Sequence, residues 1–132
     1  MSKELRIIIL AAGKGTRMNS DLPKVLHKLN GKALLDFVLD ESELLNPKET
    51  ILVVGFKKEL VISHTQHRAN LKYVTQMEQL GTGHAVLQTA DLLKNKEGHI
   101  LILYGDVPNI KESTLRPIID DHLINNRDLT LI

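Results

Sequence analysis

The sequence predicts an α/β fold: a Rossmann-like, mainly parallel sheet with helices on both faces. Two observations carry this prediction. Segments typical of strands alternate with segments typical of helices, and the best strand candidates are apolar throughout, as strands buried on both faces are. The chain has 132 residues, of which 42% are hydrophobic, and this is enough for one core. We therefore expect residues 1–132 to form a single domain.

The expected elements follow from apolar patterns and turn residues. Apolar runs predict strands at residues 5–10, 50–54, 71–74 and 99–104, and residues 129–132 predict the beginning of a fifth strand. Helical spacing predicts helices at residues 33–45, at residues 58–66 and after Gly83, and Ser113 is expected to cap a last helix. Residues 25–29 are expected to be extended, and Asn30-Gly31 to form a turn.

The composition argues against several classes of protein. The formal net charge is +1 and the aromatic content is 3%, so the chain has little positive charge to attract nucleic acid and few aromatic rings on which bases could stack. The absence of cysteine excludes disulfides and thiolate metal sites, and it is compatible with the cytoplasmic location that we expect. The longest apolar run is far too short to span a membrane, so no membrane association is expected.

The most informative stretch is L-A-A-G-K-G-T-R-M-N-S-D-L-P-K, at residues 10–24, directly after the first strand. Gly13 and Gly15 allow a sharp turn and a close approach to a ligand, because neither carries a Cβ atom. Successive backbone N–H groups in such a loop can bind anions. Residues 14–32 carry five cationic side chains and one acidic side chain, in a chain of net charge +1. This concentration of charge favours a polyphosphate ligand.

Other interpretations of this loop remain open from the glycines alone. No stretch has the G-x-x-x-x-G-K-[ST] spacing of a P-loop, and Met18 stands where the dinucleotide fingerprint has its third glycine, so neither motif is present. An ordinary glycine turn with a solvated basic rim would also explain Gly13 and Gly15. Arg17 and Lys24, at fixed offsets from these glycines, favour phosphate binding.

Two further segments follow predicted strands: Q-M-E-Q-L-G-T-G-H-A at residues 76–85 and Y-G-D-V-P at residues 104–108. In parallel sheets the carboxyl ends of the strands share one edge, and ligands bind beyond it. We therefore expect both segments to meet the glycine loop in one site. From its motif alone, Asp106 is as compatible with a turn-forming role as with an oxygen ligand for Mg²⁺.

The sequence L-A-A-G-K-G-T-R-M, followed by D-L-P-K-V-L-H, resembles the signature loop of the sugar-phosphate nucleotidyltransferases. Its long form is most similar to that of the bacterial N-acetylglucosamine-1-phosphate uridylyltransferases. The resemblance implies a nucleotide-diphospho-sugar transferase fold, Mg²⁺ as cofactor, and UTP and a sugar 1-phosphate as substrates. The implied reaction converts UTP and N-acetylglucosamine 1-phosphate into pyrophosphate and UDP-N-acetylglucosamine, a cell-wall precursor.

The same resemblance implies roles for particular residues. Arg17 and Lys24 would be the catalytic cations, and Asp106 would be a Mg²⁺ ligand. Gln76 would recognise uracil, because an amide offers a donor and an acceptor to the imide edge of the base. The implied nucleotide contacts are Ala11, Ala12, Gly13, Lys14, Gly15, Thr16, Gln76, Gly81 and Thr82.

The resemblance covers only the front part of the family's catalytic domain, so we expect a truncated fold. The family's sugar-binding loops, an asparagine that shares the metal, and a following β-helix acetyltransferase domain are expected to be absent. Two alternatives therefore stay open: a related enzyme with another nucleotide or acceptor, and a non-catalytic nucleotide-binding module. We expect this chain to bind nucleotide weakly, to turn over the sugar phosphate negligibly and to self-associate through an exposed sheet edge.

Overall fold

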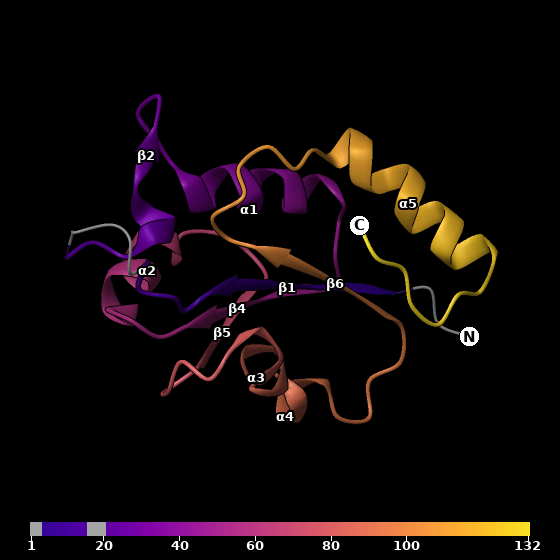
Figure 1. The fold of residues 1–132 in the computed structure, drawn as a ribbon. Coiled ribbons are helices and arrows are strands. Elements are labelled where there is room, and N and C mark those ends of the chain that lie inside the picture. Colours follow the sequence, from indigo (N-terminus) through magenta and orange to yellow (C-terminus); the bar gives the residue numbers. More distant parts are fainter. Residues whose placement is uncertain (1–3, 16–20) are drawn as a thin grey trace.

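A four-stranded parallel sheet forms the centre of the fold. The computed structural model describes residues 4–15 and 21–132. The sheet has the strand order β5-β4-β1-β6, so β1 lies between two neighbours (Figure 1). Its strands are β1 (Leu5–Ala11), β4 (Glu49–Val54), β5 (Leu71–Thr75) and β6 (His99–Tyr104). Four of the predicted strands are thereby confirmed to within one residue at either end.

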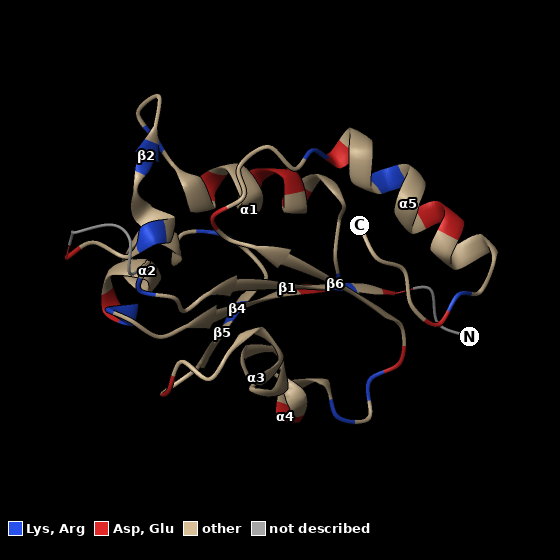
Figure 2. Cartoon of the chain, in the orientation of Figure 1, with Lys and Arg blue, Asp and Glu red and all other residues tan. Residues whose placement is uncertain are grey.

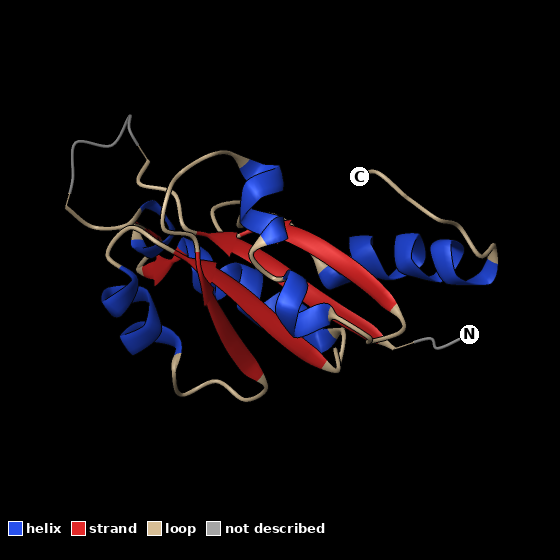
Figure 3. Cartoon of the chain, turned by 90° about the horizontal axis from the view of Figure 1, so that it is seen from below, coloured by secondary structure: helices blue, strands red, loops and turns tan. Residues whose placement is uncertain are grey.

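Helices cover both faces of this sheet, as the sequence predicts. On one face lie α1 (Leu34–Leu44), α2 (Lys58–Thr65) and α5 (Glu112–Ile124). The short helices α3 (Thr82–Leu87) and α4 (Ala90–Leu93) lie on the other face, in front of the strands in Figure 3. Successive side chains of β1 point to alternate faces of the sheet: Ile7 lies in the core on the side of α1, α2 and α5, and Ile8 in the core on the side of α3 and α4. Both faces of β1 are therefore buried, which explains its uninterrupted apolar sequence.

A small hairpin connects the glycine loop to α1. After the 3-10 turn η1 (Lys24–Leu26), β2 (Lys28–Leu29) pairs antiparallel with β3 (Lys32–Ala33). The predicted turn lies between them, with positive φ angles of 53° at Asn30 and 81° at Gly31, as the favoured two-residue hairpin turn requires. The expected extended segment is therefore helical at its start and extended only at its end.

Three expectations about elements are wrong. Helix α5 begins at Glu112, so Ser113 lies inside it, and Lys111 is the N-cap residue. The helix expected after Gly83 is divided into α3 and α4, and the Thr89 hydroxyl between them donates to Val86 O at 2.7 Å. Residues 129–132 form no strand. The Thr130 hydroxyl is hydrogen-bonded to His122 Nδ1 at 2.9 Å, which ties this segment to α5 rather than to β6.

Charged side chains lie mostly on the helices and loops around the sheet (Figure 2), but Glu49 is a buried exception. Its carboxylate accepts hydrogen bonds from Arg6 Nε at 3.2 Å and from Lys96 Nζ at 2.9 Å. Lys72 Nζ lies 2.9 Å from its other oxygen. Arg6 is also buried and donates to Glu97 O at 3.0 Å. This ion network joins β1, β4 and β5 at the amino end of the sheet.

The ionised form of Glu49 is stabilised by these partners. Burial alone raises the pKa of its carboxyl, but hydrogen bonds from Lys72 and Lys96 outweigh burial and hold the pKa at about 2, below the ordinary 4.5. A carboxyl whose pKa is lowered in the folded state stabilises the fold at pH values above its ordinary pKa. That contribution is lost as the pH falls from about 4.5 towards 2.

Among the described residues, no helix combines the length and the apolar character needed to cross a membrane.

We predict that Glu49→Gln lowers the free energy of unfolding at pH 7 by about 3–5 kcal/mol, because Arg6 stays buried without its carboxylate. Urea denaturation followed by circular dichroism at pH 7 and pH 3 measures this loss, which should shrink at the lower pH. The exposed Glu78→Gln is the matched control and should change little. A Glu49→Gln deficit equal at both pH values would contradict the assignment.

Candidate functional site

The three sequence segments meet in a pocket of about 370 Å³ at the carboxyl edge of the sheet. It is lined by Leu10, Ala11, Ala12, Gly13, Gly15, Lys24, Val25, Gln76, Gln79, Gly81, Thr82, Ala85, Tyr104 and Asp106. The blue segments of η1, of β2 and of the start of α2 lie at the same end of the molecule in Figure 2. The expected convergence is therefore observed, and it places positive charge beside the pocket.

Backbone hydrogen bonds hold the loops around this pocket. Gly105 N donates to Leu10 O at 2.9 Å, and Gln76 N donates to Val54 O at 2.8 Å. These bonds extend the parallel pairing of the strands into the loops that follow them. The positions of the second and third segments are thus set by the register of β1 with β6 and of β4 with β5.

Gly15 lets the first loop pack closely on Lys24. Its φ angle is +70°, in the left-handed region that favours glycine. A Cβ atom at this position would lie 2.9 Å from Lys24 Cβ, which is closer than real side chains approach. The loop therefore turns directly against the base of the Lys24 side chain. Thr16 and Arg17, two expected site residues, lie outside the described residues.

Lys24 and Asp106 form an ion pair at the pocket, with 2.9 Å between Lys24 Nζ and Asp106 Oδ2. The two side chains come from the first and third segments, and they remain 43% and 28% exposed. The charge of Asp106 is therefore balanced by a lysine that a ligand can reach. The sequence predicted a role for each residue but not this contact between them.

The side chains near Asp106 limit the kind of metal site that the pocket could form. Within residues 4–15 and 21–132, no cluster of three or more His, Cys, Asp or Glu side chains could hold a metal by itself. Asp106 instead offers a single carboxylate at a pocket that also contains a cationic loop. This arrangement fits Mg²⁺, which is commonly held by one or two carboxylates together with water and the phosphates of a substrate.

The Gln76 side chain is buried and its amide is fixed by two contacts. Nε2 donates to Gly81 O at 3.2 Å and lies 3.0 Å from His84 Nδ1. Donation to both partners uses both amide protons, and it requires His84 Nδ1 to be the acceptor. In the described part of the chain, Gln76 Oε1 makes no hydrogen bond and is not enclosed. An acceptor at a fixed position therefore remains for a ligand, and the contact with His84 was not anticipated.

The remaining expected residues divide into two groups. Ala11, Ala12, Gly13, Gly81 and Thr82 all line the pocket, as expected for residues close to a ligand. Lys14 lies between two lining glycines but does not itself line the pocket, and its ammonium lies 5.5 Å from the centroid of the Phe56 ring.

Gln79 and Tyr104 line the pocket but were not singled out from the sequence. Both lie inside the two segments that were expected to form the site. Their sequence signal was a position at or just after the end of a strand and not residue type, and such a signal does not tell which side chains turn inward.

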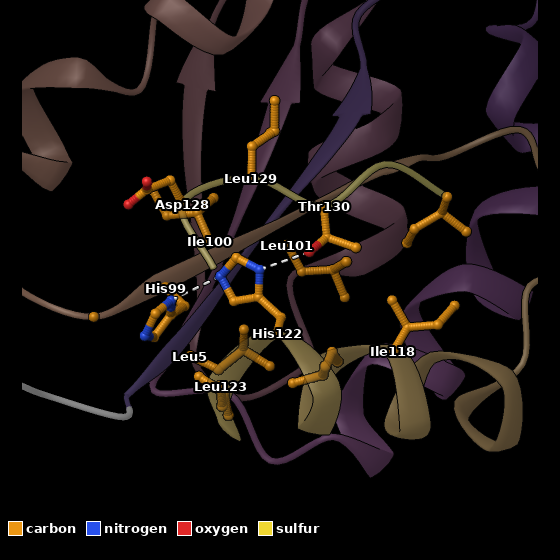
Figure 4. A pocket seen from close by; sticks show the side chains of 13 residues that line it. Leu5, His99, Ile100, Leu101, Ile118, His122, Leu123, Asp128, Leu129 and Thr130 are labelled. Atoms are coloured by element: carbon orange, nitrogen blue, oxygen red, sulfur yellow. Dashed lines mark hydrogen bonds between the residues drawn. The ribbon is translucent and has the colours of Figure 1, made fainter. Parts of the chain in front are cut away.

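A second pocket of about 310 Å³ lies at the opposite edge of the sheet, between β6, α5 and residues 128–132 (Figure 4). There His99 Nδ1 lies 3.1 Å from His122 Nε2, and the two rings meet edge to face. Its other lining residues are mostly apolar, and no described lysine or arginine lines it. This pocket is therefore poorly suited to a polyphosphate.

Comparison with known proteins identifies the family. Residues 7–130 match the MobA-like NTP transferase domain. The chain is 48% identical over 126 residues to the bifunctional protein GlmU of Cyanothece sp. and 44% identical over 128 residues to that of Acaryochloris marina. These alignments cover 96% and 97% of this chain but 28% of each relative. The chain thus spans less than a third of the length of these relatives.

Solved structures share the fold at low sequence identity. A nucleotidyl transferase from Methanothermobacter thermautotroptrophicus matches with a TM-score of 0.73 and 22% identity, over 90% of this chain and 58% of that protein. A UDP-glucose pyrophosphorylase in complex with UDP-glucose matches with a TM-score of 0.76 and 19% identity, over 93% and 54%. Rv0371C of Mycobacterium tuberculosis H37Rv, solved with manganese, matches with a TM-score of 0.73 and 22% sequence identity. This match covers 90% of this chain and 59% of that protein.

These likenesses agree with the predicted nucleotide-sugar transferase fold, and the chain covers only part of each solved protein. From the match over residues 7–130, we conclude that the chain belongs to the family of MobA-like NTP transferase domains.

Proposed function

We propose that this chain is the nucleotide-binding part of a uridylyltransferase and forms one domain, the N-terminal part of a nucleotidyltransferase domain. The proposed parent reaction converts UTP and N-acetylglucosamine 1-phosphate into UDP-N-acetylglucosamine and pyrophosphate. The observation that carries it is the pocket in which the glycine loop, Gln76 and the Lys24–Asp106 pair meet. Relatives called GlmU, 41–48% identical over 96% of this chain or more, support the same proposal. We also propose a cytoplasmic location.

In the proposed reaction, an oxygen of the sugar phosphate attacks the α-phosphorus of UTP. The bond from that phosphorus to the bridging oxygen breaks, and pyrophosphate leaves with the bonding electrons. Negative charge therefore accumulates on the phosphate chain in the transition state. Lys24, at the pocket, and Arg17 would stabilise this charge without a covalent step. When bound at Asp106, Mg²⁺ would neutralise phosphate charge, and Lys24 would then be free to contact the nucleotide.

The proposal is tested by measuring UTP and uridine binding to this chain by isothermal titration calorimetry, with and without Mg²⁺. We expect UTP to bind more tightly than uridine and Mg²⁺ to strengthen only UTP binding. Pyrophosphate release on addition of N-acetylglucosamine 1-phosphate then separates an enzyme from a binding module. Equal binding of UTP and uridine would overturn the proposal.

Uracil selectivity is attributed to Gln76 Oε1. With His84 Nδ1 as the acceptor, both amide protons are engaged by Gly81 and His84, and the oxygen is the atom left to meet a base. Uracil presents an N–H donor at N3, whereas cytosine presents an acceptor there. A fixed carbonyl oxygen would therefore attract uracil and repel cytosine.

We predict that Gln76→Ala narrows the preference for UTP over CTP by about 1–3 kcal/mol, the cost of an unmatched buried polar group. Competition titrations with both nucleotides measure the change. Gln88→Ala is the control, because Gln88 contacts His84 but does not line the pocket. A wild-type chain that binds UTP and CTP equally would exclude this role for Gln76.

We predict that Arg17→Ala weakens UTP binding about 10–100-fold and leaves uridine binding unchanged, because a charge-assisted hydrogen bond to phosphate is lost. Calorimetry with both ligands measures the difference. Lys28→Ala is the control: Lys28 is an exposed cation of the same basic stretch that does not line the pocket, so its removal should change UTP binding little. Equal losses for UTP and uridine would mean that Arg17 acts on the structure and not on phosphate.

Self-association through β6 is a further part of the proposal. Among the strands of the described residues, β6 pairs with β1 alone, so it is an edge of the sheet. Ile100, Ile102 and Tyr104 alternate along it and are 42–50% exposed. An edge with free backbone groups and apolar side chains favours pairing with a second copy.

We predict that the wild-type chain forms oligomers as its concentration rises, and that Ile102→Lys lowers the oligomer fraction. Sedimentation velocity over a concentration series measures this fraction. Leu60→Lys, on helix α2, charges a similarly exposed apolar position away from this edge and should leave association unchanged. A wild-type chain that stays monomeric at every concentration would contradict the edge argument.

A further inference from the structure

The connection between β4 and α2, residues 55–57, contacts two walls of the pocket without lining it. A Cβ atom added to Gly55 would lie 2.9 Å from Gln76 O and 3.0 Å from Ala12 Cβ, so these segments touch at this glycine. Phe56 N donates to Ala12 O at 3.1 Å. The connection is thereby held at a fixed place beside the glycine loop, although sequence patterns gave it no role.

The ring of Phe56 is approached by two lysine side chains. Lys14 Nζ lies 5.5 Å from the ring centroid and Lys57 Nζ lies 5.8 Å from it. Both distances fall within the range in which the ring quadrupole attracts a cation. Lys14 comes from the glycine loop, whereas Lys57 is the N-cap residue of α2. Two cations from separate segments are therefore gathered at one aromatic ring.

The contact with this ring is an interaction of the Lys14 ammonium itself. Among the described residues, Lys14 has no ion pair or side-chain hydrogen bond, and its neighbours Gly13 and Gly15 line the pocket. A free lysine side chain loses much rotational freedom when it binds an anion. Contact with the half-buried ring already restricts the Lys14 side chain before a ligand binds, so less rotational freedom is lost on binding. Preorganisation of this kind increases affinity.

We propose that Phe56 is a positioning residue for the phosphate chain of the nucleotide: its ring holds the ammonium of Lys14, whose neighbours Gly13 and Gly15 line the pocket. This inference rests on the proposed function and adds to it a residue outside the lining of the pocket. Lys57 shares the ring, but neither of its neighbours in the sequence lines the pocket, whereas both neighbours of Lys14 do. Phe56 therefore acts through Lys14.

A double-mutant cycle tests the proposal. In the chain with Lys14 intact, Phe56→Leu should raise the dissociation constant for UTP about two- to fivefold, the size of an exposed cation–π contact. In the Lys14→Ala background, the same change should have no effect. Uridine binding should be equal in all four proteins. Phe56→Trp keeps an aromatic face and should bind UTP at least as tightly as the wild type.

Lys57→Asn is the matched control, since asparagine tolerates the left-handed φ angle of 48° at this position. In that background the Phe56→Leu effect should persist. Thermal melting checks that each variant folds, and Phe56→Trp supplies a second readout if Phe56→Leu does not. Weaker UTP binding by Phe56→Trp, or an unchanged Phe56→Leu effect without Lys14, would overturn the inference. A wild-type chain that binds UTP no better than uridine would instead overturn the proposed function, and the inference with it.

Discussion

The parallel pairing of β1 with β4 and β6 is the constraint on which the rest of the structure depends. Ile8 pairs with Ile51 on one side and with Ile102 on the other, so three strands run in the same direction in fixed register. Their loops must then leave from one edge. The site owes its existence to this geometry, because residues far apart in the sequence meet only where the strands end.

Charge is distributed around the sheet in two different ways. At the amino edge, Glu49 and Arg6 are buried together and their pairing serves stability. At the carboxyl edge, Lys24 and Asp106 stay partly exposed, and their pairing can be exchanged for contacts with a ligand. Exposed ion pairs contribute little to stability, so separating them costs little free energy. The structure thus combines an end with buried charges and an end with accessible charges.

The strands could be predicted from the sequence because burial on both faces leaves a nearly continuous apolar run, as in β1 and β4. The meeting of Lys24, Gln76 and Asp106 could also be predicted, since each follows a parallel strand. Contacts between side chains could not: the Lys24–Asp106 pair, the Gln76–His84 contact and the stacking of Lys14 on Phe56 depend on side-chain directions in loops. Residues 129–132 have strand-like sequence but are held by His122 instead, a tertiary contact without local signal.

We propose that a nucleotide binds at the carboxyl edge of the sheet and not in the pocket beside His99 and His122. Titration of the ¹⁵N-labelled chain with UTP and Mg²⁺, followed by NMR, distinguishes the two places. We expect the largest amide shift changes in residues 10–15, 76–85 and 104–106, with His99, His122 and Thr130 nearly unchanged. Changes concentrated around His99 and His122, with the glycine loop unaffected, would contradict it.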